Sequence, residues 1–296
     1  MANILGVGIA TLDIINTVED FPAEDAEVRA IRQAVRRGGN ATNTLVVLSQ
    51  LGHGCHWAGT LADDVDSRVI SDELARYGID ASRVSVIPGG HAPTSYVTLN
   101  QRNGSRTIVH YRDLAEYSAA AFQRIALADF DWLHFEGRNV TETHAMLQHA
   151  RARAPQLPIS LEIEKPRENI EALCGLADLL LYSRIYAEHR GFVEGTGGPE
   201  AFLTGQQRSF PNADHVCTWG AAGAYGITRQ GQFFHAGAYS PPHLVDTLGA
   251  GDTFNAGMID ASLRQYSLDS ALQHANRLAG LKCGQPGFAG LGEQFL

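Results

Sequence analysis

The feature that most constrains this chain is a regular alternation of short apolar runs with longer amphipathic segments. Strands are expected near residues 4–9, 55–60, 131–136, 158–162, 178–181 and 214–218. Helices are expected near 40–51, 65–77, 141–152, 198–208, 252–265 and 268–283. Strands that alternate with helices pair in parallel, because each helix returns the chain to the edge where the next strand starts. The sequence therefore predicts an α/β fold over residues 1–296, a doubly wound and mostly parallel sheet with helices on both faces.

Two segments interrupt this alternation. Residues 10–18 and 28–35 are rich in β-branched and apolar residues, and residues 84–112 contain short strands split at Gly89-Gly90 and Asn103-Gly104. Asn-Gly between apolar runs is a strong hairpin signal. We expect residues of about 10–35 and 90–112 to form a small β lid beside the main sheet. Its apolar face, including Val28, Ile31, Tyr96 and Val97, has no helix in the sequence to cover it.

Composition excludes several classes of protein. The net charge of −9 argues against nucleic-acid binding, and no run of 18 apolar residues could cross a membrane. Four cysteines without CxxC spacing favour neither a zinc ribbon nor a disulfide scaffold. The chain has only two lysines, Lys165 and Lys282, and neither lies in a GxxxxGK[ST] loop. We therefore expect a cytoplasmic protein that binds neither nucleic acid nor membrane and is not a P-loop NTPase.

Residues 245–257 carry the strongest chemical signal. Gly249-Ala250-Gly251 forms a flexible turn, and Asp252 follows it at the expected start of a helix. Backbone N–H groups at a helix start make a cradle for anions. A carboxylate beside a bound phosphate can accept the proton of an attacking hydroxyl. The pattern equally allows Asp252 to be an ordinary helix N-cap.

The segment Asp246–Asp252, DTLGAGD, resembles the DTxGAGD signature of the PfkB (ribokinase-like) carbohydrate kinases. Near the other end, Arg37–Asn43, RGGNATN, resembles the second signature of that family. The strings at 136–139 (EGRN), 162–168 (EIEKPRE) and 282–288 (KCGQPGF) are similar to those of its ketohexokinase subgroup. The resemblance covers the whole chain and implies a single ribokinase-like kinase domain.

The resemblance also implies roles for individual residues. Asp252 would be the base that deprotonates the sugar hydroxyl, and Gly249, Ala250 and Gly251 would form the anion hole. The residues implied to bind the sugar are Asp13, Asp25, Gly39, Asn40 and Asn43. Those implied to bind the nucleotide are Arg106 at the phosphates, Thr218, Gly220 and Gly223 in a second glycine turn, and Asn255, Ala279 and Cys283 along the adenine pocket.

Without the resemblance, several of these residues have ordinary structural interpretations. Asp13 could be a buried and satisfied polar group, Asp25 a solvated surface residue, and Arg106 an exposed strand residue. Asn40 could serve only as the N-cap of the helix that follows it.

The resemblance implies ATP and Mg²⁺ as cofactors and leaves open a requirement for K⁺. An N-x-x-E segment that organises magnesium in much of the family is replaced here by residues 183–186, SRIY. The protein ligands of the metal therefore stay unassigned, and we expect ATP phosphates and water to hold it. Glu162, Glu164 and Lys165 form a charged strand end that we interpret as support for neighbouring site residues or as structural.

These implications define the expected function. The chain would transfer the γ-phosphoryl group of ATP to a ketose hydroxyl, converting D-fructose to fructose 1-phosphate. The alternatives are a related kinase for another small sugar or a nucleoside, and a regulator that binds nucleotide or sugar without turnover. The implied partner is a second copy of the chain, paired through the β lid in a homodimer.

Overall fold

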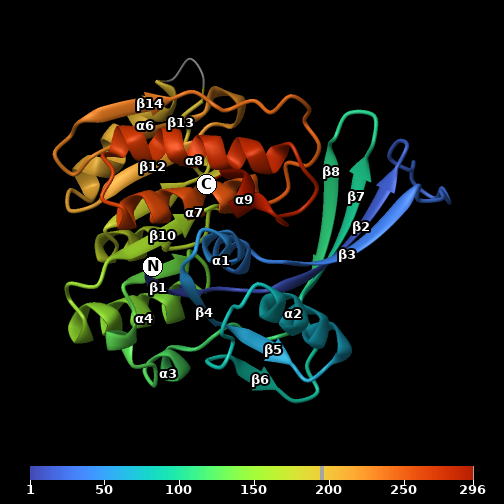
Figure 1. Cartoon of the computed structure of the whole chain (residues 1–296), viewed down its shortest axis with the longest axis horizontal. Helices are drawn as coiled ribbons and strands as arrows, with labels where there is room; N and C mark the ends of the chain where they lie inside the picture. Colours follow the sequence, from blue (N-terminus) through green and yellow to red (C-terminus); the bar gives the residue numbers. More distant parts are fainter. Residues whose placement is uncertain (194–196, 296) are drawn as a thin grey trace.

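The computed structural model describes residues 1–193 and 197–295, and its largest element is an eight-stranded sheet (Figure 1). The strand order is β14-β13-β12-β11-β10-β9-β1-β4. Its strands are β1 (Asn3–Val7), β4 (Gly54–Ala58), β9 (Trp132–Glu136), β10 (Ile159–Ile163), β11 (Leu179–Tyr182), β12 (Asp214–Thr218), β13 (Ala224–Ile227) and β14 (Phe233–Ala236). All pair in parallel except β13 and β14, which join antiparallel at one edge. The predicted parallel α/β sheet is confirmed.

Helices cover both faces of this sheet, each with its own apolar core (Figure 1). One core joins α1, α7, α8 and α9 to the sheet through residues such as Leu45, Phe254 and Leu278. The other joins α4 and α6 through Leu147 and Phe202. The helices are α1 (Asn40–Gln50), α2 (Val65–Arg76), α3 (Ala119–Phe122), α4 (Val140–Arg153), α5 (Arg184–His189), α6 (Gly198–Ser209), α7 (Ala250–Leu263), α8 (Leu268–Cys283) and α9 (Leu291–Phe295), with 3-10 turns at Leu127–Asp129, Ile170–Leu176 and Gly220–Ala222. Burial on both faces explains why the strands appear in the sequence as continuous apolar runs.

A second sheet of four strands projects from the main body (Figure 1). Its order is β3-β2-β7-β8, with β2 (Thr11–Val18), β3 (Arg32–Gly38), β7 (Thr94–Asn100) and β8 (Arg106–Tyr111). The predicted Asn103-Gly104 turn joins β7 to β8, and Gly104 has a φ of 70°. We call these four strands the small sheet. A separate pair, β5 (Thr60–Ala62) and β6 (Ser85–Ile87), lies beside α2.

The strand expected at 28–35 lies instead at Arg32–Gly38. Pairing with β2 sets these bounds, because Thr17 lies opposite Arg32 and Thr11 opposite Gly38. The apolar residues Val28 and Ile31 that suggested an earlier start are exposed before the strand. Local periodicity could not detect a register that depends on the partner strand.

Neighbouring residues of the small sheet point to opposite faces. Val35, Ile14, Tyr96 and Val109 lie opposite one another across the four strands and form one row on one face. Tyr96 is 50% exposed, whereas Val97 on the other face is 3% exposed. The expectation that Tyr96 and Val97 share one uncovered face is therefore wrong.

Among residues 1–193 and 197–295, no helix combines the length and apolarity that a membrane crossing requires.

Candidate active site

A cavity of about 750 Å³ opens where the parallel strands end, between the main sheet and the small sheet. It is lined from the ends of β9, β10 and β12, from the start of α7, and from the small sheet. The carboxyl edge of a doubly wound sheet is where such folds bind ligands, and the volume suits a small-molecule site. The expected chemistry therefore lies in a cavity at this edge of the sheet.

The start of α7 forms one wall of the cavity. The helix begins at Ala250, and its N-cap is Gly249, whose φ of 80° favours glycine. A Cβ at Gly249 would also lie 2.4 Å from the Phe288 ring, whereas one at Gly251 would point into open space. The first N–H groups of an α-helix have no partner within the helix, so this open turn can bind an anion. Asp252 is the third helical residue, so the N-cap interpretation is wrong.

Asp252 is buried, at 7% exposure, and points to a residue from the other end of the chain. The Asn43 Nδ2 group donates to Asp252 Oδ2 at 2.6 Å. Burial raises the pKa of Asp252 to about 7, helped by the Glu164 and Glu136 carboxylates, while the Asn43 bond and Arg37 act in the opposite direction. A carboxylate with this pKa can accept a proton at neutral pH more readily than an ordinary aspartate.

Glu162, at the end of β10, is the most strongly perturbed carboxyl group beside Asp252. Burial and the neighbouring carboxylates, Asp252 first, raise its pKa well above the usual value. The amides of Asn40 and Asn255 donate to its two oxygens at 3.1 and 3.0 Å. Asn40 also donates to Glu164 at 3.2 Å. Helix α1 is capped by Gly39 with no side-chain hydrogen bond, so Asn40 faces this carboxyl cluster and is not the predicted N-cap.

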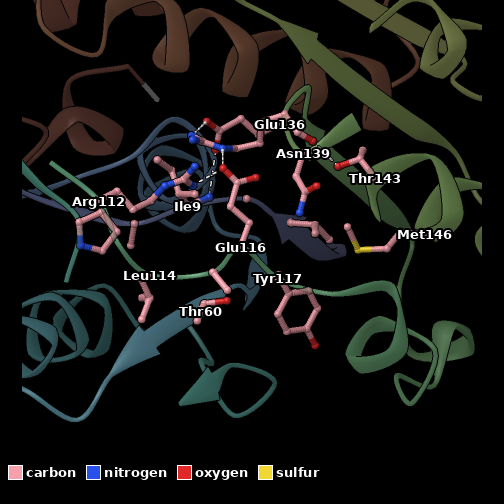
Figure 2. A pocket seen from close by; sticks show the side chains of 16 residues that line it. Ile9, Thr60, Arg112, Leu114, Glu116, Tyr117, Glu136, Asn139, Thr143 and Met146 are labelled. Carbon is pink, nitrogen blue, oxygen red and sulfur yellow. Dashed lines mark hydrogen bonds and ion pairs between the residues drawn. The ribbon is translucent and has the colours of Figure 1, made fainter. Parts of the chain in front are cut away.

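An ion-pair network borders the cavity on the side of β9. The same network lines a smaller pocket that shares Arg112 and Glu136 with the cavity, and Figure 2 shows this smaller pocket. Arg138 lies 2.8 Å from both Glu136 and Glu116, and Arg112 pairs with Glu116. The second Glu136 oxygen accepts from the backbone N–H of Ile9 at 3.0 Å. Glu136 is thereby held in place at the end of its strand, with its charge balanced on one side.

The structure brings most of the expected site residues together on this cavity. Those that line it are Asp13, Gly39, Asn40, Asn43, Arg106, Thr218, Gly220, Gly249, Ala250, Gly251, Asp252 and Asn255. They come from both ends of the sequence and meet because β1 pairs with β9 and α1 packs on α7.

Four expected residues do not line the cavity. Asp25 lies on the exposed loop between β2 and β3, with a φ of 63°. Gly223 forms the turn before β13, where a Cβ would lie 2.1 Å from the carbonyl oxygen of Ala236. Ala279 and Cys283 belong to α8, and the Cys283 carbonyl accepts from Val245 at 2.8 Å.

Several groups that line the cavity were not among the expected site residues. Glu162, Glu164 and Lys165, which we expected to be supporting or structural, are part of its wall. The strings EGRN and EIEKPRE at strand ends were the signal that could have identified them. Six cationic side chains surround the opening, namely Arg106, Arg112, Arg138, Lys165, Arg167 and Arg184.

The fold and the site together define a class of protein that comparison with known sequences also identifies. Residues 1–291 match the pfkB family of carbohydrate kinases. The chain belongs to this family and is an enzyme of the ATP-dependent carbohydrate kinase class.

Individual relatives agree with this assignment. The chain is 40% identical to the ketohexokinase of Mus musculus over 295 residues, covering 97% of this chain and 98% of the relative. Its fold matches a putative ribokinase from Agrobacterium tumefaciens with a TM-score of 0.86 and 23% identity, covering 99% and 96% of the two chains. It also matches an Arabidopsis thaliana ribokinase complexed with ribose and ATP, with a TM-score of 0.79 and 16% identity over 97% and 95%.

Proposed function

We propose that this enzyme transfers the γ-phosphoryl group of ATP to a hydroxyl of D-fructose and forms fructose 1-phosphate. The observation that carries the proposal is the buried Asp252 carboxyl, poised at the anion-binding start of α7 and inside a cavity of sugar-plus-nucleotide size. The choice of fructose among sugars rests on the 40% identity to a protein named ketohexokinase.

The proposed reaction assigns one step to each feature of α7. Asp252 accepts the proton of the sugar hydroxyl as the hydroxyl oxygen attacks the γ-phosphorus, and ADP leaves. The N–H groups at Gly249, Ala250 and Gly251 stabilise the charge that develops on the transferred group. The turn is already formed, but the Ala250 N–H donates to the Thr247 carbonyl at 3.2 Å and would have to share or leave that bond.

Short polar side chains on the small sheet and α1 would bind the sugar. Burial raises the pKa of Asp13, while hydrogen bonds from Thr11 and Ser95 oppose this rise. The Thr11 hydroxyl donates to Asp13 at 2.9 Å and orients its carboxyl group. Asp13, Asn40 and Asn43 offer both acceptors and donors, which is what a ring of hydroxyls requires.

Of the six cationic side chains that line the cavity, Arg106 and Arg167 suit the polyphosphate of ATP best, because the other four form ion pairs with carboxylates. In the described part of the chain, no three His, Cys, Asp or Glu side chains are grouped to hold a metal ion. Ser183 caps α5 by accepting from the Tyr186 N–H at 3.0 Å, so residues 183–186 provide a helix start instead of the acidic segment. The proposal therefore has Mg²⁺ enter with ATP, bound mainly by phosphate oxygens and water.

The decisive experiment is a substrate panel. Purified protein with Mg-ATP is offered D-fructose, other ketoses, aldoses, ribose and nucleosides, in K⁺ and in Na⁺ buffers. Phosphorus–proton NMR then locates the phosphate on the product. We expect the highest kcat/KM with D-fructose and phosphate on the first carbon. A higher kcat/KM for ribose or a nucleoside than for D-fructose would show that fructose is not the preferred substrate. The assignment to the carbohydrate kinases would still stand.

We also propose that the small sheet is a lid that pairs with its copy in a homodimer. Supporting this, apolar side chains of the sheet stand in solvent, including Val35, Tyr96, Ile108 and Val109. An uncovered sheet of this kind is a natural interface for a second copy. Asp25 lies away from the cavity of its own chain, so its predicted role at the sugar would require the lid of a second copy to carry it there.

The cytoplasm is the proposed location. Cys55, Cys174, Cys217 and Cys283 are all free thiols, and three of them are buried in the folded chain. Reduced thiols are usual for proteins of the cytoplasm. Fractionation of cells that express the protein, with kinase activity measured in each fraction, tests this location.

A further inference from the structure

We propose that Arg37 is a positioning residue for this site: its guanidinium fixes the amide orientation of Asn43, so that Asn43 donates its hydrogen bond to Asp252. The inference rests on the proposed function in one respect only, the role of Asp252 as base. Arg37 itself does not line the large cavity between the two sheets.

The Asn43 side chain makes two contacts that depend on the orientation of its amide. Its Oδ1 accepts from Arg37 Nη1 at 2.8 Å, and its Nδ2 donates to Asp252 Oδ2 at 2.6 Å. A guanidinium has donors and no acceptor, whereas an ionised carboxylate has acceptors and no donor. If the amide were reversed, its NH2 group would face the N–H donors of Arg37, and its oxygen would face the carboxylate oxygen of Asp252. Arg37 therefore selects the orientation that suits an ionised Asp252.

The position of Arg37 is itself firmly held. Nη1 also donates to the Thr42 hydroxyl at 2.8 Å, and that hydroxyl donates to the Gly38 carbonyl at 2.9 Å. On the other side, Arg37 Nε lies 3.5 Å from Glu73, and the Arg37 backbone N–H donates to Glu73 at 3.0 Å. The guanidinium is thus fixed from both α1 and α2.

Stability alone is a poor explanation for this arginine. Its side chain is fully buried, and its Nε and Nη2 atoms make no hydrogen bond within the described residues. Burying a cation with unsatisfied donors is costly, and an apolar residue of the same size would often be at least as stable. A function at the neighbouring Asn43 accounts for keeping a guanidinium there.

Several charged groups act on Asp252 together with Arg37. Burial raises the Asp252 pKa, and the carboxylates of Glu164 on the β10 side and Glu136 on β9 raise it further. The Asn43 hydrogen bond from α1 and the charge of Arg37 from β3 lower the Asp252 pKa. The charge of Asp252 in turn raises the pKa of Glu162 on β10. Arg37 also faces Glu73, Tyr77 and Asp13. Removing the guanidinium takes away both influences that favour the ionised base.

The test is the pH profile of kcat/KM for Arg37→Met, which removes the charge and keeps the length. We expect the acid limb to move to higher pH. At pH values below the limb, kcat/KM of the variant then falls below that of wild type by about tenfold for each unit that the midpoint moves. At high pH this difference in kcat/KM becomes small. A folded Arg37→Met enzyme whose acid limb coincides with that of wild type overturns the proposal.

Glu73→Gln is the matched control. It removes the charge on the other side of Arg37 and leaves the contact to Asn43 in place. We expect its acid limb to stay at the wild-type position, and a limb that moves as in Arg37→Met would assign the effect to the Glu73 ion pair instead. If Arg37→Met does not fold, Arg37→Leu carries the same comparison, since leucine has no donor for Asn43, and an unmoved limb there overturns the proposal.

A carbon-13 NMR titration of the Asp252 carboxyl group, assigned with Asp252→Asn, separates the two hypotheses. An upward shift of the Asp252 pKa in Arg37→Met supports the positioning role even if no sugar in the panel is phosphorylated. Normal turnover of the wild type, combined with an unchanged Asp252 titration in Arg37→Met, contradicts the positioning role and leaves the kinase assignment standing.

Discussion

At the scale of single residues, Asp252 determines how the enzyme should respond to pH. The proposed base must be ionised, and burial with nearby carboxylates raises its pKa to about 7. Activity should therefore rise with pH through about 7, since protonated Asp252 cannot accept the proton of the sugar. The measurement is kcat/KM for the sugar from pH 5 to 9 at saturating ATP. Constant activity down to pH 5 would contradict a base with this pKa.

Asp252→Asn tests the same residue without a pH change. The substitution keeps the shape of the side chain and removes the base, so kcat should fall by about 10²–10⁴-fold. Binding of sugar and ATP, measured by calorimetry, should be largely retained. Near-normal turnover by Asp252→Asn would remove the residue from the mechanism.

Asn43 and Asp25 should respond differently to alanine substitution. Asn43 touches the base, so Asn43→Ala should lower kcat and raise the sugar KM, by roughly two- to tenfold for one lost hydrogen bond. Asp25→Ala should raise only the sugar KM, because Asp25 lies on the loop of the small sheet. The KM for ATP serves as the control in both variants. Equal changes in both KM values would assign these residues to the nucleotide site or to the fold.

At the scale of elements, helix α7 has a second important carboxylate. Asp260 is fully buried and accepts hydrogen bonds from His274 on α8 at 2.7 Å, from His53 beyond α1 at 2.9 Å, and from Arg264 at 2.9 Å. This one side chain ties three segments of the helical layer together. It lies outside the cavity, so its role is structural.

Asp260→Asn should lower the free energy of unfolding by about 1–3 kcal/mol at neutral pH, because it weakens hydrogen bonds to a charged group. Burial alone would raise the Asp260 pKa, but the bonds from His274, His53 and Arg264 hold it below the usual value. This stability is present above the ordinary aspartate pKa of about 4 and is lost as the pH falls below it. Urea unfolding at pH 7 and pH 3 measures both effects, with the exposed Asp72→Asn as control. Equal stability of wild type and Asp260→Asn at pH 7 would contradict this role.

Elements with a strong local pattern were predictable from sequence, and those defined by distant partners were not. The apolar strands and the amphipathic helices of the main sheet had enough residues to show their period. Strands β13 and β14 did not show a period, because each has only four residues. In β13, Gly226 also lacks the side chain that would mark the face against which Leu268 and Leu272 of α8 pack. Helix α7 was expected to begin at 252, but the turn at Gly249 starts it at Ala250.

At the scale of the whole molecule, the proposed lid predicts a dimer that closes over the sugar. Ile108 and Val109 point to opposite faces of the small sheet, and both are exposed. Ile108→Asp and Val109→Asp therefore charge one face each, and sedimentation should show that one of them dissociates the dimer. Hydrogen exchange with and without fructose should show protection of 25–35 and 94–110 by the sugar. If the wild type is a monomer and these segments are fully protected before sugar is added, the lid proposal is contradicted.

The candidate site was predictable to the extent that motifs fixed it. The signatures at 37–43 and 246–252 identified residues that meet in the cavity, because short glycine turns leave a local trace. The hydrogen-bond partners of Glu162 were not predictable, because its burial and its bonds to Asn40 and Asn255 depend on the packing of α1 and α7 over β10. The position of Asp25 depends on the small sheet, and no local pattern indicates the cavity to which its loop belongs.

The hydrogen bond between Asn43 and Asp252 joins residues 209 positions apart, and this has a consequence for synthesis of the protein. A ribosome adds about 5–20 residues per second, so the proposed sugar-binding residues leave the peptidyl transferase centre about 10–40 s before the base. A nascent or truncated chain that ends before α7 lacks the proposed base and the anion turn. Such a chain could neither phosphorylate a sugar nor hydrolyse ATP. Kinase activity would therefore appear only after translation had passed Asp252.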